Sequence, residues 1–399
     1  MIDAVGSRRR RYYGLVEDIT SPLDSPYSRS SLLLDCIDSD MFDARGEADL
    51  DTGEGLFLVR TVSTPRVWKE RFNLGNLLPG DWVELELVPR IGGPMAWEMS
   101  ALRGYRRGPR LTLRKIRRLG TGRDGAGPSD PDPKLASRLY WSSENQRPKA
   151  PAFDPAAFLK RLKPVDGEPF RFIVLDVGQA SAILIRRGDK NLGLFDAGAP
   201  LWFNKGSVDL GFKPPKLDGG FIFISHWDWD HYDMGRRHAP YHLIDWFAPD
   251  QHVGYNTARF QKSLGGRLHF VSGAFGNGQP FSFTPATGPI GDRNNSGYLL
   301  CFDEDGERVL LTGDANYTAI PGALLQGVTA LSVPHHGGAA APPPGARGLA
   351  RAVVSYGQPN SYRHPHAAHI DALEAANWTV KRTAQHGFWP RGNRQLYPA

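Results

Sequence analysis

The sequence contains few cysteines and no long apolar run. Only two of its 399 residues are cysteine, Cys36 and Cys301, and each lies in a run typical of a β-strand. Two distant cysteines exclude a disulfide framework and favour a reducing compartment, with the thiols packed in a core. No apolar stretch approaches the ~20 residues of a membrane-spanning helix, and no apolar run of signal-peptide length follows the arginine-rich start. We therefore expect a cytoplasmic protein that does not enter a membrane.

The chain also lacks a strong charge imbalance. Its formal net charge at pH 7 is +6, and 40% of its residues are hydrophobic. The length is sufficient for two domains with separate cores. The small positive charge is compatible with an anionic substrate but does not indicate one by itself.

Residues 1–119 are expected to form a small all-β domain. Short runs rich in β-branched and aromatic residues alternate with turn residues, which is typical of a small barrel or sandwich. The Pro-Gly-Asp-x-Val-x-Leu pattern at 79–85 is similar to barrels of the OB type. The predicted strands cover residues 12–19, 31–37, 55–63, 81–88 and 96–102.

A basic run closes this domain. Nine arginine and lysine residues lie between Arg103 and Arg123 with no acid among them, and Tyr105 lies inside the run. Such a run could neutralise a phosphate backbone, which makes Arg114 and Arg117 candidate substrate contacts; the alternative is a solvated basic surface. Residues 120–164 are rich in Gly, Pro, Ser and Asp, which predicts a flexible linker that includes short helices.

The third segment, residues 165–399, is organised around one loop with the sequence Ser-His-Trp-Asp-Trp-Asp-His. The apolar residues Phe221–Ile224 before it indicate a buried strand that runs into this loop. Imidazole nitrogen and carboxylate oxygen together suit a divalent cation. The alternative is a solvated polar loop in which two tryptophans serve packing. The four potential ligands are His226, Asp228, Asp230 and His231.

Six further blocks follow in the order Leu175–Gln179, Leu194–Gly198, Asn294–Ser296, Leu311–Asp314, Val333–Gly338 and Asn360–Pro365. Together with His-x-Asp-x-Asp-His, they resemble the metallo-β-lactamase-fold hydrolases. More narrowly, they are similar to the hydrolase domain of bacterial competence (DNA-uptake) channel proteins and to its free-standing soluble relatives. The resemblance covers a little over half of the chain. It implies an α/β fold, the four-layer αβ/βα sandwich of that family, with the site at the edge between two sheets.

The resemblance also implies a centre of two divalent metal ions. The family's further histidine for the first ion has no counterpart here, because Asn294-Asn295-Ser296 stands in its place. An Asp at position 228 adds a hard oxygen ligand, so Mn²⁺ or Zn²⁺ is expected, with Mg²⁺ also open. Carried over residue by residue, the ligands are His226 and Asp228 for the first ion, Asp230, His231 and His335 for the second, and Asp314 between them.

Other polar residues of these blocks are candidates for catalysis or substrate contact. Asp230 would orient the attacking water, and His364 would donate a proton to the leaving group. His336 would contact substrate or support a ligand by a hydrogen bond. Trp227 and Trp229 would wall the pocket or stack on a base. Asn360, a further catalytic candidate, and Tyr362 would position phosphate oxygens. Asn295 and Ser296 are the remaining candidates for substrate contact.

These features favour a metal-dependent hydrolase, a phosphodiesterase or nuclease that cleaves DNA with metal-activated water. One alternative is a small-molecule hydrolase of the same fold, acting on a cyclic nucleotide, lactone or thioester. Another is a nucleic-acid-binding or interaction protein, against which the intact ligand set argues. The expected partners are nucleic acid, DNA rather than RNA, and a regulatory protein.

Overall fold

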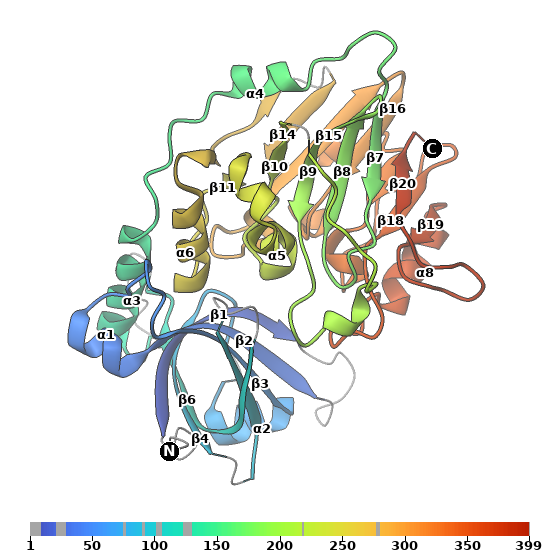
Figure 1. Cartoon of the computed structure of the whole chain (residues 1–399). Coiled ribbons are helices and arrows are strands. Elements are labelled where there is room, and N and C mark those ends of the chain that lie inside the picture. Colours follow the sequence, from blue (N-terminus) through green and yellow to red (C-terminus); the bar gives the residue numbers. More distant parts are fainter. Residues whose placement is uncertain are drawn as a thin grey trace. The chain divides into compact units, whose positions relative to one another are not determined.

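The computed structural model describes residues 9–20, 29–74, 77–89, 92–100, 106–122, 130–217, 219–276 and 280–398. Arg103, Tyr105 and Arg123 of the basic run lie outside these ranges, as do residues 123–129 of the predicted linker. The chain divides into two compact units (Figure 1). Unit 1 comprises residues 1–149 and 252–265, and unit 2 comprises residues 150–251 and 266–399.

Unit 1 is built around a closed barrel of six strands in the order β1-β2-β3-β5-β6-β4. The sequence predicts the first five strands, and the sixth is the basic run. Side chains alternate along a strand, so Leu111 and Leu113 enter the core while Arg110 and Arg114 face outward. The OB likeness stays a prediction. The strands are β1 (Arg10–Thr20), β2 (Ser30–Asp38), β3 (Leu56–Ser63), β4 (Trp82–Pro89), β5 (Met95–Ser100) and β6 (Arg106–Gly120).

The helices of unit 1 include one from the predicted linker. Asp132 accepts a hydrogen bond from the Leu135 N–H, and Pro133 occupies the first turn. Both residues favour the start of a helix at this position. The buried Ala136 and Leu139 then hold this helix in place. The helices are α1 (Ser39–Arg45), α2 (Pro65–Phe72), α3 (Pro133–Asn145) and α6 (Tyr255–Leu264).

Helix α6 belongs to unit 1, although its neighbours in sequence belong to unit 2. The buried carboxylate of Asp35, on β2, accepts hydrogen bonds from the backbone N–H groups of Asn256 (3.0 Å) and Thr257 (3.3 Å). It also accepts one from the Asn256 side-chain amide (2.6 Å). A Cβ at Gly254 would lie 2.4 Å from this carboxyl group, so only glycine fits. An anion at the helix N-terminus therefore holds α6 to the barrel.

Unit 2 contains two seven-stranded sheets, which confirms the predicted α/β class. Their facing sides share an aromatic core that includes Phe172, Phe223, Phe283 and Phe302. Helix α5 lies against the first sheet and α8 against the second (Figure 1). The helices of unit 2 are α4 (Pro155–Arg161), α5 (Trp229–Arg237), α7 (Gly322–Leu325) and α8 (Ala367–Ala375).

The first sheet has the order β12-β11-β10-β9-β8-β7-β20 and the second the order β13-β14-β15-β16-β17-β18-β19. The strands of the first are β7 (Phe170–Val174), β8 (Ala182–Arg187), β9 (Lys190–Ala197), β10 (Phe221–Phe223), β11 (Asp245–Pro249), β12 (Leu268–Val271) and β20 (Arg394–Tyr397). Those of the second are β13 (Phe275–Gly276), β14 (Phe281–Pro285), β15 (Tyr298–Glu304), β16 (Glu307–Leu311), β17 (Ala330–Ser332), β18 (Arg351–Val354) and β19 (Thr379–Arg382).

Parallel pairing brings the polar blocks of unit 2 together. Strands β9 and β10 run parallel in the first sheet, and β16, β17 and β18 run parallel in the second. The carboxyl ends of parallel strands meet at one edge of a sheet, where ligands are usually bound. The residues at or just after these ends are Asp196, the 225–231 loop, Asp314, His336 and the 355–366 loop. In the part of the chain that the structure describes, no helix is both long enough and apolar enough to cross a membrane.

Candidate metal centre

Histidine and aspartate side chains converge at this edge of unit 2. Two overlapping sets each place their ligand atoms within 4.8 Å of one another. His231 Nε2 lies 3.1 Å from Asp314 Oδ1, and His336 Nε2 lies 3.3 Å from Asp230 Oδ2. The sets are His226, His231 and Asp314, and Asp230, His231 and His336.

Each imidazole of the cluster is held through its Nδ1 atom. His231 Nδ1 lies 2.8 Å from Asp196 Oδ2, and His226 Nδ1 lies 3.0 Å from Ser225 Oγ. His336 Nδ1 donates to the Ser355 carbonyl (2.9 Å). The Nε2 atoms of all three rings are buried and form no hydrogen bond of good geometry with any described residue, although each lies 3.1–3.5 Å from a carboxylate oxygen. An unpaired buried polar atom costs about 1–3 kcal/mol, so these nitrogens require a ligand of their own.

The character of that ligand follows from the acceptors around it. When the His231 ring is neutral and its Nδ1 donates to Asp196, its Nε2 carries a lone pair that faces the Asp314 carboxylate. Two acceptors at 3.1 Å repel unless a cation lies between them. The donor set of imidazole and carboxylate fits a divalent metal ion, and the Nδ1 partners are of the kind that orient metal-binding histidines.

The electrostatics of the cluster also favour positive charge. Burial by itself lowers the pKa of His231, but Asp314 and Asp196 outweigh burial and raise this pKa well above its usual value. Burial raises the pKa of Asp314, but His231, His336 and His335 outweigh it, and this pKa falls well below its usual value. The pocket therefore stabilises a cation beside ionised carboxylates, and a metal ion supplies that charge while the imidazoles stay neutral.

The two sets share one nitrogen. Both use His231, and its Nδ1 is already bonded to Asp196, so only Nε2 is left for a metal. One lone pair binds one ion. His231 can therefore serve only one of the two sets at a time, and a second ion would have to bind without it.

Asp228 lies beside the cluster but in neither set. Its Oδ1 is 3.1 Å from Arg293 Nη2, and its Oδ2 is 3.5 Å from His226 Nε2. Burial alone would raise the pKa of Asp228, but Arg293 and His226 outweigh burial and lower it to about 2. Arg293 is itself buried, at 7% exposure. It keeps a positive charge at every accessible pH.

Arg293 is the site residue that the sequence analysis missed. It directly precedes Asn294-Asn295-Ser296, the block that stands in place of the family's further histidine. Asn295 and Ser296, predicted to contact substrate, are used within the fold. The Asn295 side chain bonds to Asp292 and to the backbone N–H of Asn316, and Ser296 accepts a hydrogen bond from Gln251. The positive charge of Arg293, directly before this block, was the feature of the sequence that could have located it.

The structure also separates the two adjacent histidines of the Val333–Gly338 block. His335 and His336 both have left-handed backbone angles, with φ of 51° and 53°. This turn aims His336 at Asp230 and Asp314, whereas the His335 ring lies against His364 at 5.3 Å between centroids. The placement differs from the sequence prediction, which assigned His335 to the metal and His336 to a supporting role.

The 355–366 loop places His364 at the edge of the cluster. Its Nδ1 lies 3.1 Å from the Gln179 amide nitrogen, so Nδ1 accepts and the proton is on Nε2. Burial, His335 and His336 hold the pKa of His364 well below its usual value, so the ring is neutral at pH 7. The Tyr362 ring stacks on it at 5.6 Å. His364 is thus a neutral hydrogen-bond donor and not a charged acid.

The Asn360 side chain stabilises this loop through hydrogen bonds to the loop backbone. Its amide nitrogen donates to the carbonyls of Gly357 and His364, and its oxygen accepts from the His364 N–H. These bonds use the groups that were predicted to hold phosphate oxygens.

Trp227 and Trp229 are buried, at 0% and 2% exposure, so they pack beneath the ligand loop and cannot stack on a base.

Arg114 and Arg117 lie on β6 in unit 1 and are paired with acids. Arg114 lies 3.3 Å from Glu86, and Arg117 lies 3.1 Å from Glu84 and 3.4 Å from Asp132. Both glutamates lie on strand β4. This strand is hydrogen-bonded to β6 along its length, so the glutamates lie beside the arginines. A sequence scan of one strand cannot detect acids on its neighbour.

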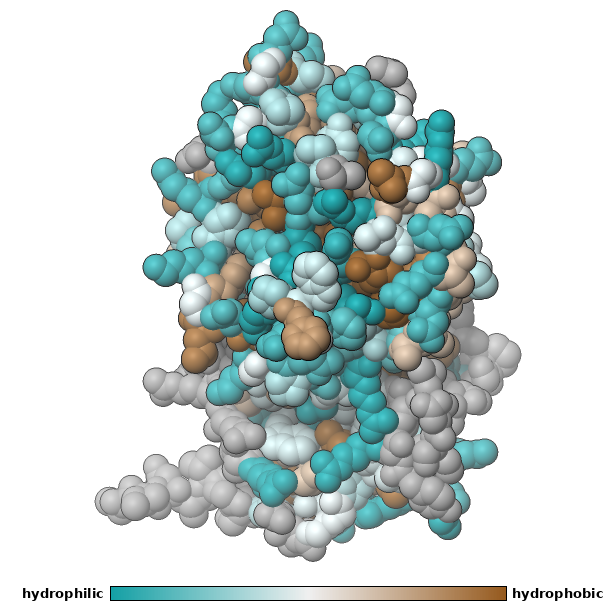
Figure 2. Space-filling view, turned by 90° about the vertical axis from the view of Figure 1, so that its right-hand side faces the viewer, coloured by the Kyte–Doolittle hydropathy of each residue, from teal (hydrophilic) through white to brown (hydrophobic). Residues whose placement is uncertain are grey.

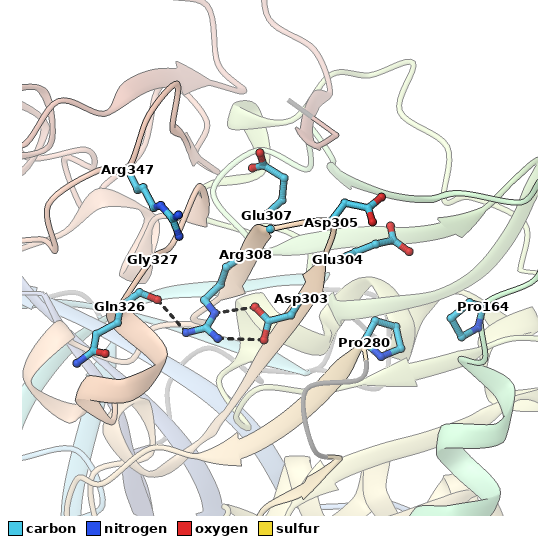
Figure 3. A pocket seen from close by; sticks show the side chains of 11 residues that line it. Pro164, Pro280, Asp303, Glu304, Asp305, Glu307, Arg308, Gln326, Gly327 and Arg347 are labelled. Atoms are coloured by element: carbon cyan, nitrogen blue, oxygen red, sulfur yellow. Dashed lines mark hydrogen bonds and ion pairs between the residues drawn. The ribbon is translucent and has the colours of Figure 1, made fainter.

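A separate cleft of about 980 Å³ lies at the turn between β15 and β16 (Figure 3). No residue of the histidine cluster lines it. Its walls carry the acids Glu304, Asp305 and Glu307, and Arg308 is held by Asp303 at 2.7 Å. An acidic cleft repels an anionic substrate, so it is not an extension of the metal centre.

No protein-family model and no curated protein matches this chain. Among solved structures, the chain is similar to a probable metal-dependent hydrolase from Staphylococcus aureus, at 14% identity and a TM-score of 0.24, over 33% of this chain and 57% of that one. It is also similar to Zn²⁺-bound PqqB from Methylobacterium extorquens, at 12% identity and a TM-score of 0.33, over 56% and 99%. A third match is Tm1679, a metal-dependent hydrolase of the β-lactamase superfamily, at 12% identity and a TM-score of 0.29, over 56% and 98%.

Proposed function

We propose that the chain is a metal-dependent hydrolase of the metallo-β-lactamase superfamily that cleaves phosphodiester bonds in DNA. One observation carries the hydrolase proposal: three buried imidazole Nε2 atoms face aspartate carboxylates without a hydrogen-bond partner among the described residues. Protein interiors rarely leave such atoms unpaired unless a ligand uses them.

The residues that would hold the metal are His226, Asp230, His231, Asp314 and His336. A divalent ion in this position would lower the pKa of a water molecule and neutralise charge on a phosphate. Asp230 is the most exposed of the five, with 17% of its side chain accessible. It would orient the attacking water at the open side of the cluster. His364 would donate its Nε2 proton in a hydrogen bond to the substrate.

An anionic substrate is supported by the charge beside the cluster. Arg293 places a permanent guanidinium beside the cluster, where it is paired with Asp228, and the whole chain is basic. Guanidinium groups bind phosphate oxygens well, because their N–H groups are arranged as a fork. Mn²⁺ or Zn²⁺ is the proposed cofactor, since the set combines imidazole nitrogen with carboxylate oxygen.

The test is hydrolysis of bis(p-nitrophenyl) phosphate and of labelled DNA by the wild type and Asp314→Ala, each with Mn²⁺, Zn²⁺ or Mg²⁺. Asp305→Ala, in the acidic cleft, is the matched control. We expect metal-dependent cleavage of both substrates that Asp314→Ala lowers at least about 100-fold and Asp305→Ala leaves unchanged. Cleavage that persists in Asp314→Ala, or that needs no metal, would contradict the proposal. Cleavage of the small diester alone would favour the second candidate, a hydrolase of cyclic nucleotides.

A further inference from the structure

The segment between β19 and β20 presents two aromatic rings to solvent. Residues 386–389 form a tight hairpin, closed by backbone hydrogen bonds from His386 N to Trp389 O (3.1 Å) and from Trp389 N to His386 O (3.0 Å). The side chain of Phe388, at the tip, is fully exposed, and that of Trp389 is 69% exposed. Two adjacent exposed aromatic side chains on a fixed turn present an apolar surface that is accessible to a ligand.

Positive charge surrounds these rings. Lys381 Nζ lies 5.2 Å from the centre of the Trp389 ring. The Arg394 guanidinium donates to backbone carbonyls, among them that of Arg382 (2.8 Å). Among the described residues, no carboxylate forms an ion pair with Lys381 or Arg394. These side chains line a recess of about 280 Å³ beside Trp389. Figure 2 shows the molecule from the side on which β19 and β20 lie in Figure 1. On this face, apolar side chains lie among hydrophilic ones.

The hairpin begins at the edge of the sheet that carries the metal centre. Strands β18 and β19 run parallel and therefore end on the same side. Just after them, the Thr383 hydroxyl bonds to the Tyr356 backbone at both N–H (3.1 Å) and carbonyl (3.0 Å). The residue before Tyr356 is Ser355, whose carbonyl accepts the hydrogen bond of His336. A short series of contacts within unit 2 thus joins the hairpin to the cluster.

We propose that Phe388 and Trp389 form a stacking platform for unpaired bases of a nucleic-acid substrate, with Lys381 and Arg394 on its phosphates. This inference rests on the proposed function and narrows its substrate to single-stranded segments. Aromatic faces and cations in alternation are the features by which proteins bind single strands without reading sequence. In a duplex the bases already stack on one another, so the rings have no free face to bind.

The arrangement fits a nucleic acid better than it fits a lipid surface. Two rings bury little apolar area, whereas membrane-surface segments present a broad apolar face. Arg114 and Arg117 of β6 are less suited to the task, because Glu86 and Glu84 already pair with them. The cations beside the hairpin keep their charge for a partner.

The test compares the binding of fluorescein-labelled (dT)20 and a 20-base-pair duplex, by fluorescence anisotropy in EDTA to prevent cleavage. Four proteins are used: the wild type, Phe388→Ala/Trp389→Ala, Lys381→Ala and the control Leu349→Ala. Leu349 is also an exposed apolar residue, at 95% exposure, but its side chain has no aromatic ring on which a base could stack. Because each stacked base contributes appreciably, we expect the double variant to raise the Kd for (dT)20 about 30-fold or more. Lys381→Ala should raise it about threefold to tenfold, and Leu349→Ala should not change it.

Hydrolysis of bis(p-nitrophenyl) phosphate by the same proteins separates the two proposals. The platform variants should hydrolyse this small diester at the wild-type rate, since it has no base to stack. If the wild type fails to hydrolyse it, the proposed function fails. If hydrolysis is normal but the double variant binds (dT)20 as tightly as the wild type does, the platform proposal is wrong. It is also wrong if the double substitution weakens binding of the duplex as much as binding of (dT)20. Loss of binding to vesicles of anionic lipid, with (dT)20 binding unchanged, would also overturn it and assign the hairpin to a membrane surface.

Discussion

At the scale of single residues, the adjacent histidines 335 and 336 offer a sharp comparison. His336 points at two carboxylates of the cluster, and His335 does not belong to either ligand set. We expect His336→Ala to lose bound metal and His335→Ala to keep it, as measured by elemental analysis of the purified proteins. Circular dichroism should show both variants folded. Metal loss in His335→Ala alone would restore the assignment made from the sequence.

Arg293 leads to a second prediction at this scale. If its guanidinium holds an anionic oxygen of the substrate, Arg293→Gln should raise the KM for a phosphodiester about tenfold or more, which is the size of a lost charged hydrogen bond. Metal content should stay at the wild-type level, because Arg293 is not a metal ligand. Arg293→Lys, which keeps the charge, should recover part of the affinity. Unchanged KM in both variants would exclude a substrate contact.

At the scale of elements, the carboxylate of Asp35 holds the start of α6. Asp35→Ala would remove the hydrogen bonds that this buried carboxylate accepts from the N–H groups of Asn256 and Thr257, and we expect it to lower the free energy of unfolding by about 2–3 kcal/mol. Urea unfolding followed by fluorescence measures this loss. Asp40→Ala, at an aspartate of the same unit whose side chain is 83% exposed, serves as the control and should cost far less. An equal effect of both substitutions would exclude a capping role.

Strand β4 supplies a pH-dependent contact to its neighbours. Burial by itself would raise the pKa of Glu84, but Lys115, Arg117 and Arg11 outweigh it and lower this pKa below 4.5. A lowered carboxylate pKa adds stability above pH 4.5 that disappears as the pH falls through the folded-state value. Glu84→Gln should therefore destabilise the protein at pH 7, and its melting temperature should approach that of the wild type below pH 4. A constant difference across this range would show that the ion pairs contribute nothing.

Most strands could be predicted from the sequence, because alternation and apolar runs are local properties. Short helices within residues 120–164 could also be expected, but no comparable local signal marks the sixth barrel strand, where apolar residues alternate with charged ones and pack against distant partners. The same holds for the site. The blocks with His226, Asp230, His231 and Asp314 could be located from spacing and resemblance. The choice of His336 over His335 depends on two left-handed residues in one turn, and the Arg293–Asp228 pair depends on tertiary contact.

At the scale of the whole molecule, the division into units predicts the behaviour of fragments. Residues 252–265 belong to unit 1, and α6 buries Tyr255, Phe260 and Leu264. A fragment of residues 150–399 carries α6 without the barrel and would expose these side chains. We expect it to aggregate or to bind a hydrophobic dye, as size-exclusion chromatography and dye fluorescence would show. The full chain is the control, and a monomeric, dye-free fragment would contradict the division.

The position of α6 also constrains how the protein is made. Asp35 and Asn256 are 221 residues apart in the chain, yet they share a buried hydrogen bond. Unit 1 therefore cannot be completed when its barrel leaves the ribosome; it must wait until about two thirds of the chain has been synthesised. Many proteins finish their N-terminal domain first during translation. Here unit 1 is completed only after much of unit 2 has been synthesised, and the barrel without α6 is the stage at which a chaperone would be needed.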